Sequence, residues 1–173
     1  MKELVDNLTN RDRNIQNDCI KVLYEIGERK PALIADYGVE FLALLDGKNN
    51  RLVWGAMTAI DTITVENAGA VYAALPKIRE IANSGSVITR DHAVNIMIKL
   101  ASIRKYEDGA FRRLIEQLRR CPPNQLPMYA ENAVAIVNEA NKAAFIRTLA
   151  SRLDAVTTDA KRRRLEKVIK KAG

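Results

Sequence analysis

The chain has 173 residues, a length that fits one domain with a sizeable hydrophobic core. Hydrophobic residues make up 47% and aromatic residues 5%, which excludes a disordered chain and favours closely packed helices over an aromatic-rich sandwich of strands. The net charge of +7 is uneven, because residues 1–86 hold 10 Lys and Arg against 12 Asp and Glu, and residues 87–173 hold 18 against 9. The second half therefore predicts an acidic partner or a basic tail.

Helical periodicity, turn residues and prolines predict ten helices in chain order. Six lie at about residues 2–8, 11–28, 31–45, 50–64, 66–83 and 87–104, and four at about 107–120, 125–138, 141–154 and 158–171. The helix over 31–45 is expected to be interrupted near Tyr37-Gly38. Pro76 is expected to bend or restart the helix over 66–83, because its ring clashes with the carbonyl four residues back.

Four of these helices carry the same apolar stripe at i, i+3, i+4 and i+7, which is one helix face. The stripe recurs every 37 residues, as Cys19, Val22, Leu23 and Ile26, then Ala56, Ala59, Ile60 and Ile63, then Ala93, Ile96, Met97 and Leu100, then Ala130, Ala133, Val134 and Val137. A fixed period of this size is the signature of a repeat protein. We expect an all-α, right-handed α-α superhelix with a 37-residue period, a single domain over 1–173. It would hold about five antiparallel helix pairs, over about residues 2–29, 31–65, 66–104, 106–140 and 141–173.

The turn Leu45-Asp46-Gly47, followed by an Ala-containing second helix that begins near Arg51, resembles the HEAT-repeat family, an armadillo-type α-solenoid. Pro76 inside a first helix is similar to the kinked first helices of that family. The resemblance covers nearly the whole chain. It implies that the second helix of each pair lines a concave surface, and it specifies architecture far more than function.

On each second helix, the side opposite the buried stripe is the predicted binding surface. It is polar and of mixed charge, and it holds the only tryptophan, Trp54. Tryptophan is enriched at binding hot spots, so Trp54 is either an anchor for a partner or is packed under a neighbouring helix end. The predicted partner-binding residues are Lys21, Arg51, Trp54, Thr58, Asp91, Asn95, Lys99 and Asn132.

Basic residues crowd the last predicted helix. They are interpreted either as the solvated face of a capping helix or as a docking site for nucleic acid, another polyanion or an acidic protein. No aromatic residue interleaves with them, so stacking of single-stranded bases is not supported. The residues of this alternative site are Lys161, Arg162, Arg163, Arg164, Lys167, Lys170 and Lys171.

The sequence offers few groups for chemistry. His92 is the only histidine and lies beside a buried stripe, where a helix-packing role is expected, and Cys19 and Cys121 are far apart in the chain. No Gly-rich phosphate loop or zinc-ligand spacing occurs. No catalytic residue, metal, cofactor or small-molecule substrate is therefore predicted. The HEAT resemblance leaves two enzymatic alternatives open: an alkylpurine DNA glycosylase, with Asp91 and Trp54 facing one groove, and a bilin-lyase-like protein.

The sequence thus predicts a non-enzymatic scaffold that binds a macromolecule, most simply a protein, on the concave surface. Polyanion binding through the basic half is the alternative. No run approaches the roughly 18 apolar residues that a membrane span needs. Charged and apolar residues alternate over Met1–Thr9, unlike a signal peptide. A soluble cytoplasmic protein without membrane insertion is expected.

Overall fold

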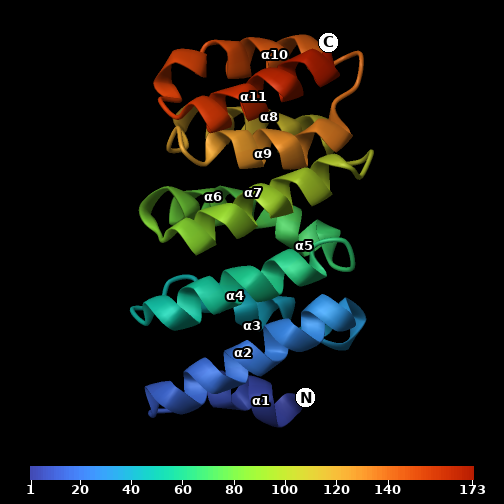
Figure 1. Cartoon of the computed structure of the whole chain (residues 1–173). Helices are drawn as coiled ribbons and strands as arrows, with labels where there is room; N and C mark the ends of the chain where they lie inside the picture. The colour runs from blue at the N-terminus through green and yellow to red at the C-terminus, as the bar shows by residue number, and fades with distance from the viewer. The chain divides into compact units, whose positions relative to one another are not determined.

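A computed structural model describes the whole chain, residues 1–173, and all of its regular structure is helical (Figure 1). Eleven α-helices and five short 3₁₀ helices follow one another without any strand. The predicted all-α class is confirmed. The chain divides into two compact units, here called the N-terminal unit (Met1–Leu100) and the C-terminal unit (Ala101–Gly173). The single domain and the superhelix with its 37-residue period stay predictions.

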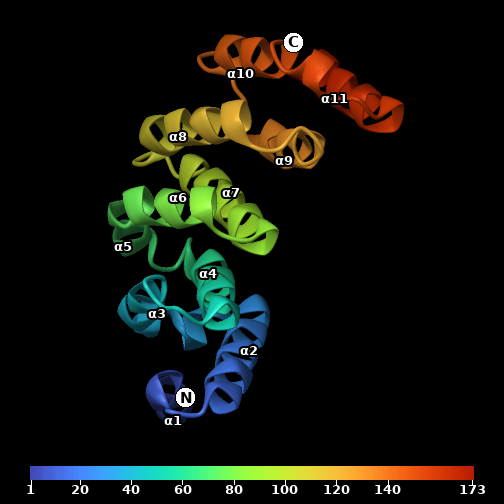
Figure 2. The ribbon, with the colours of Figure 1, turned by 90° about the vertical axis from the view of Figure 1, so that its left-hand side faces the viewer.

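The N-terminal unit consists of two layers of helices (Figure 2). One layer holds α1, α3, α5 and α6, and the other holds the longer helices α2, α4 and α7. Helix α4 packs against both α2 and α3. The elements are α1 (Lys2–Asp6), η1 (Asn7–Thr9), α2 (Arg13–Arg29), η2 (Pro31–Leu33), η3 (Ala35–Tyr37), α3 (Gly38–Leu44), α4 (Asn50–Ile63), α5 (Ala68–Ala73), α6 (Leu75–Ser84) and α7 (Val87–Ala101).

Local sequence signals account for most of these boundaries. The Asp12 carboxylate accepts a hydrogen bond from the backbone N–H of Asn14 at 2.8 Å, and the Asn49 side chain accepts one from Leu52 at 3.4 Å, so each caps the helix that follows. The restart expected at Pro76 is confirmed, because the proline occupies the first turn of α6. The expected interruption near Tyr37 is also confirmed, since two 3₁₀ turns precede α3.

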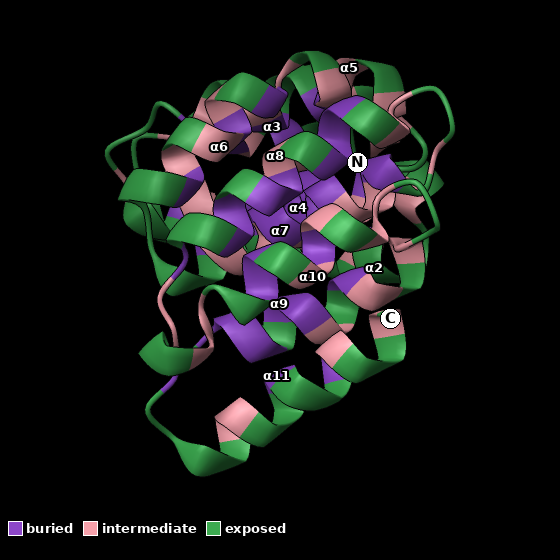
Figure 3. Cartoon of the chain, turned by 90° about the horizontal axis from the view of Figure 1, so that it is seen from above, coloured by how far each residue is buried: buried purple, intermediate pink, exposed green.

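The predicted stripes of α4 and α7 lie in the core of the N-terminal unit, whereas that of α2 is buried only in part (Figure 3). All four stripe residues of α4 and all four of α7 are 0% exposed. Val22 of α2 was expected to be buried and is 41% exposed, so that prediction is wrong. The equivalent side of α4 packs on α2, where Gly55 approaches Ile20.

The C-terminal unit holds two further helix pairs, in which α8 packs against α9 and α10 against α11. In addition α8 packs against α10, and α9 packs against α11. The elements are α8 (Glu107–Arg120), α9 (Leu126–Ala133), η4 (Val134–Ile136), α10 (Lys142–Ala150), η5 (Leu153–Ala155) and α11 (Asp159–Ala172).

Helix α9 is shorter than predicted and passes into the 3₁₀ turn η4 at Val134. The following turn uses backbone groups that a longer helix would need, because the Asn138 N–H donates to the Asn141 side-chain oxygen at 2.9 Å and the Ile136 carbonyl accepts from the Asn141 amide at 3.2 Å. Such local bonds compete with helix continuation. Val134 and Val137, which were expected on a fully buried stripe, are therefore only half-buried.

Both cysteines are free and buried, Cys19 in the N-terminal unit and Cys121 in the C-terminal unit. Burial raises the pKa of the Cys19 thiol, and the nearby negative charges of Asp18 and Glu3 raise it further. The pKa shift keeps Cys19 in the protonated, less reactive form.

Arg152 closes the C-terminal end of α8. Its guanidinium donates hydrogen bonds to the backbone carbonyls of Leu118 at 2.9 Å, Arg119 at 2.6 Å and Cys121 at 2.9 Å. The last carbonyls of a helix have no partner within the helix, so a positive fork of donors at this point satisfies them and opposes the negative end of the helix dipole.

Replacing Arg152 with alanine is expected to destabilise the C-terminal unit by about 1–3 kcal/mol, because three terminal carbonyls lose a charged donor. Arg152→Lys should recover only part of this loss, since an ammonium group cannot reproduce the planar fork. Thermal unfolding followed by circular dichroism, and amide exchange over α8, would measure the effect. The control is Arg147→Ala, which removes a bond to Ala143 on the exposed side of α10. An equal loss in the control would contradict the capping role.

Candidate functional site

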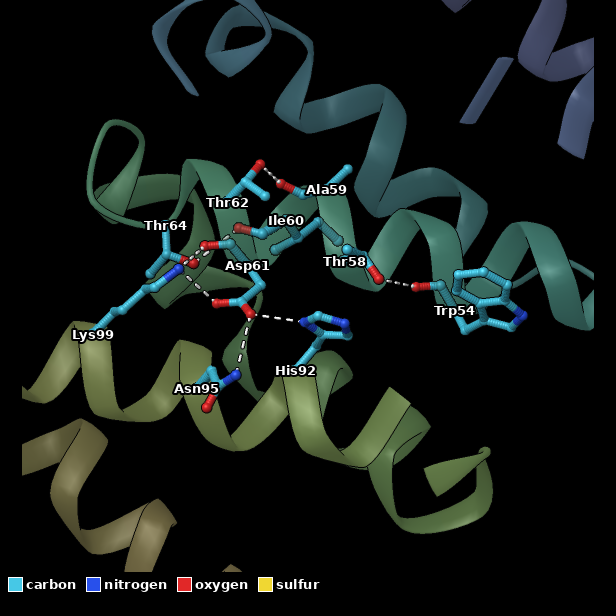
Figure 4. Close-up of polar contacts among 10 residues, drawn as sticks. All are labelled: Trp54, Thr58, Ala59, Ile60, Asp61, Thr62, Thr64, His92, Asn95 and Lys99. Carbon is cyan, nitrogen blue, oxygen red and sulfur yellow. Dashed lines mark hydrogen bonds and ion pairs between the residues drawn. The ribbon is translucent and has the colours of Figure 1, made fainter. Parts of the chain in front are cut away.

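Asp61 of α4 is the centre of a polar cluster between α4 and α7 (Figure 4). Its Oδ2 lies 2.7 Å from Nδ1 of His92 and accepts a hydrogen bond from the Asn95 amide at 3.4 Å. The Lys99 ammonium donates to the backbone carbonyl of Asp61 at 2.6 Å. Asn95 and Lys99 follow His92 by one and two helical turns, so all three reach Asp61 from one face of α7.

The Asp61 side chain is only 9% exposed, and its Oδ1 accepts no directed hydrogen bond. Lys99 Nζ nevertheless lies 2.8 Å from this oxygen, which makes the contact an ion pair. A buried carboxylate is costly unless it is paired, so the three α7 residues compensate for its burial. The cluster therefore joins α4 to α7 and fixes the positions of Asn95 and Lys99 at the surface.

A cavity of about 280 Å³ opens beside this cluster, with walls from α2, α4 and α7 that include Glu28, Thr62 and His92. Thr62 donates its hydroxyl hydrogen to the backbone carbonyl of Ala59 at 2.7 Å, and Thr58 donates to that of Trp54 at 2.9 Å. Neither hydroxyl hydrogen is directed at the imidazole. Both hydroxyls are thus bonded to carbonyls of their own helix.

An aromatic pair lies further along the same side of α4. The rings of Trp54 and Tyr24 have centroids 6.0 Å apart and are tilted by 45°, and both side chains are half-buried. Burial raises the pKa of the Tyr24 hydroxyl, the charges of Glu25 and Glu28 raise it further, and Arg51 lowers it. This pair places a solvent-accessible apolar area within an otherwise polar surface.

The structure gathers most of the predicted partner-binding residues on α2, α4 and α7. Lys21 and Arg51 are exposed, and Trp54 is half-buried. Asp91, Asn95 and Lys99 are half-buried on α7, whereas Asn132 is exposed on α9 in the C-terminal unit. Thr58 requires a correction, because it is 5% exposed and its hydroxyl is bonded within α4, so it offers nothing to a partner.

Sequence reasoning missed Asp61 and Tyr24. Asp61 carries a usable signal, because it is the one charged residue among the apolar positions of α4 after Arg51, and a carboxylate there needs a cation or donors. The residues that supply them, His92 and Lys99, are 31 and 38 positions later. The helix-packing role expected for His92 agrees with its contact to Asp61.

The basic residues of α11 do not form a uniform set. Arg164 makes a two-pronged contact with Glu131 of α9, at 2.7 and 2.5 Å. Hydrogen bonding from Arg164 lowers the pKa of Glu131, and the same contact raises the pKa of Arg164. Arg162 lies 3.3 Å from Asp154 and 3.4 Å from Glu166. The remaining predicted cations are half-buried at Lys161 and exposed at Arg163, Lys167, Lys170 and Lys171.

No group of three or more His, Cys, Asp or Glu side chains is arranged to hold a metal ion. None of the helices combines the length and the hydrophobicity that crossing a bilayer requires.

Comparisons with known proteins support the fold alone. The chain is similar to the crystal structure of an engineered protein from the Northeast Structural Genomics Consortium, target OR329, with a TM-score of 0.69 and 17% identity over 99% of this chain and 76% of that one. A second engineered protein, target OR366, matches with a TM-score of 0.53 and 18% identity over 98% of both chains. No family model and no curated protein matches the sequence.

Proposed function

We propose that the chain is a non-enzymatic, HEAT-like scaffold, a right-handed solenoid of paired helices that works in the cytoplasm. In this proposal it binds another protein on the surface that α2, α4 and α7 form in the N-terminal unit. The observation that carries the proposal is the half-exposed Trp54–Tyr24 pair within a polar surface. Tryptophan and tyrosine supply large contact areas at interfaces. Truncating either one to alanine often lowers the affinity of a complex more than truncating most other residues does.

The Asp61 cluster supports the same proposal, because it holds part of this surface rigid. Lys99 and Asn95 are tied to Asp61 before any partner arrives. A surface whose side chains are already ordered loses little conformational entropy on binding, so moderate contacts can give useful affinity. Lys21 and Arg51, which are exposed, would form the polar rim around the aromatic pair.

Polyanion binding through α11 is the less favoured function. Arg162 and Arg164 would have to break contacts with carboxylates before they could bind phosphate. The two functions differ in salt dependence, since affinity based on phosphate contacts falls by about one log unit per log unit of salt for each contact.

Trp54→Ala is expected to reduce partner binding at least about tenfold, which corresponds to a loss of about 1.4 kcal/mol or more. Affinity capture with the wild-type chain, followed by mass spectrometry, identifies the partner, and its affinity is then measured between about 50 and 200 mM salt. Tyr37→Ala, a half-buried tyrosine outside α2, α4 and α7, is the control. Equal affinity of Trp54→Ala and the wild-type chain for the partner would overturn the proposed surface. So would an affinity that is lost between about 50 and 200 mM salt in the wild-type chain and in Trp54→Ala alike.

A further inference from the structure

A groove with an apolar floor and a basic rim lies between the α9–η4 segment and α11 in the C-terminal unit. Two adjoining cavities, of about 230 and 290 Å³, both include Val134 and Lys171 in their walls. Val168 lines the first cavity and Val137 lines the second. The two cavities adjoin at these shared residues and are together called the α11 groove.

The charges in the wall of the α11 groove are not balanced. Glu131 is paired with Arg164, and Glu139 is paired with Lys142 at 2.8 Å. The two carboxylates therefore already have cations of their own. Lys167 and Lys171 line the groove, are exposed and have no carboxylate partner. They are four residues apart on α11, which places their Cβ atoms about 6 Å from each other on one face.

The net charge of the whole C-terminal unit also favours an acidic partner. Residues 101–173 hold 16 Lys and Arg against 8 Asp and Glu, a net charge of +8. A field of this sign accelerates the approach of an acidic partner, and the low-dielectric valine floor strengthens ion pairs formed at its edge.

We propose that the α11 groove binds an acidic amphipathic segment of another protein. An aliphatic side chain of that segment packs on Val134 and Val137, and two carboxylates one helical turn apart pair with Lys167 and Lys171. The valine floor favours a protein over a nucleic acid, because a sugar-phosphate backbone has no aliphatic side chain to place there. This surface is separate from the Trp54 surface of the proposed function, so either one can fail without the other.

The test uses the full chain and a fluorescent helical peptide that carries two glutamates four residues apart, with a leucine on the same face. Anisotropy titrations compare it with a peptide that has glutamines at both positions, one that has serine for leucine, and random duplex DNA. We expect the acidic peptide with leucine to bind most tightly. Lys167→Glu/Lys171→Glu should weaken its binding at least about tenfold, the effect of about 1.4 kcal/mol.

The matched control is Arg163→Glu/Lys170→Glu, which makes the same charge change on two exposed residues of α11 that do not line the groove. This variant should weaken binding clearly less than Lys167→Glu/Lys171→Glu does, because Arg163 and Lys170 lie one helical turn from Lys167 but outside the groove, where they act only through solvent. Lys167→Gln/Lys171→Gln removes the two charges without reversing them, and it should also weaken binding. Circular dichroism of each variant shows whether the loss of binding comes from lost contacts or from lost folding.

Three results would each overturn the proposal. They are equal losses in the two charge-reversed variants, tighter binding of duplex DNA than of the peptide, and no effect of replacing the leucine of the peptide with serine.

Discussion

Asp61→Leu is expected to lower the free energy of unfolding of the N-terminal unit by about 3 kcal/mol, the scale on which removing one partner of a buried ion pair destabilises a protein. The substitution removes the 9% exposed carboxylate that pairs with Lys99 and His92, whereas Lys99 keeps its hydrogen bond to the backbone carbonyl of residue 61. Both partners are more exposed than Asp61, at 39% for the Lys99 side chain and 24% for that of His92. Water can therefore reach them, which keeps the expected loss at the lower end of the range for buried pairs.

Urea unfolding followed by Trp54 fluorescence would measure this loss, because Trp54 is the only tryptophan and lies in the N-terminal unit. The decisive comparison is the triple variant Asp61→Leu/His92→Leu/Lys99→Met, which removes the whole cluster. An apolar replacement of a buried polar network is often close to neutral. The triple variant should therefore be more stable than Asp61→Leu alone. If the triple variant loses at least as much as the single one, unpaired charge is not the cause.

Gly27→Ala is expected to destabilise the N-terminal unit by about 2 kcal/mol, within the usual cost of overpacking a tight contact. A Cβ atom at Gly27 would meet Oγ1 and Cδ1 atoms of Thr62 and Ile34 at 2.2 and 2.6 Å. Rotating Thr62 would remove the contact with Oγ1 but would disturb its hydrogen bond to Ala59 and leave the Thr62 Cβ only 3.0 Å from the new atom. The higher helix propensity of alanine stabilises the helix by only about 1 kcal/mol. The steric clash is larger, so the net change in the free energy of unfolding is a loss.

The control for this prediction is Gly69→Ala, because Gly69 lies in α5 and is exposed. The same substitution should be neutral or stabilising there, by up to about 1 kcal/mol. Urea unfolding of the two variants therefore should give shifts of opposite sign, or a loss at Gly27 with no change at Gly69. A stabilising Gly27→Ala would show that α2 and α4 are not held as closely as described.

Helix positions were predictable because their signals are local. Asp12 and Asn49 cap the helices after them, and Pro76 can only lie in a first turn or break a helix, so the chain near each residue determines the boundary. Burial was less predictable, because it depends on what lies beside each helix. Val22 occupies the same repeat position as Ala59, yet Val22 is 41% exposed and Ala59 is 0% exposed.

The candidate site was predicted in part for the same reason. A surface role for Trp54 follows from its angle to the stripe of its own helix, and the structure leaves Trp54 half-exposed. The Asp61 cluster needs the register between α4 and α7, which no stripe specifies, and Tyr24 joins Trp54 only through the packing of α2 on α4. The end of α9 was misplaced because the Asn141 side chain bonds the Asn138 N–H and the Ile136 carbonyl, two backbone groups that a longer helix would use.

The two buried thiols have a practical consequence for following this protein in solution. Cys19 and Cys121 lie in different units, and neither forms a disulfide. A thiol reagent reaches each cysteine only when its surroundings open, so the labelling rates of the unmodified protein report on the two units separately. The wild-type sequence thus already contains one thiol probe of local unfolding in each unit. The labelling rates of the two cysteines show which unit opens more readily, without an engineered probe.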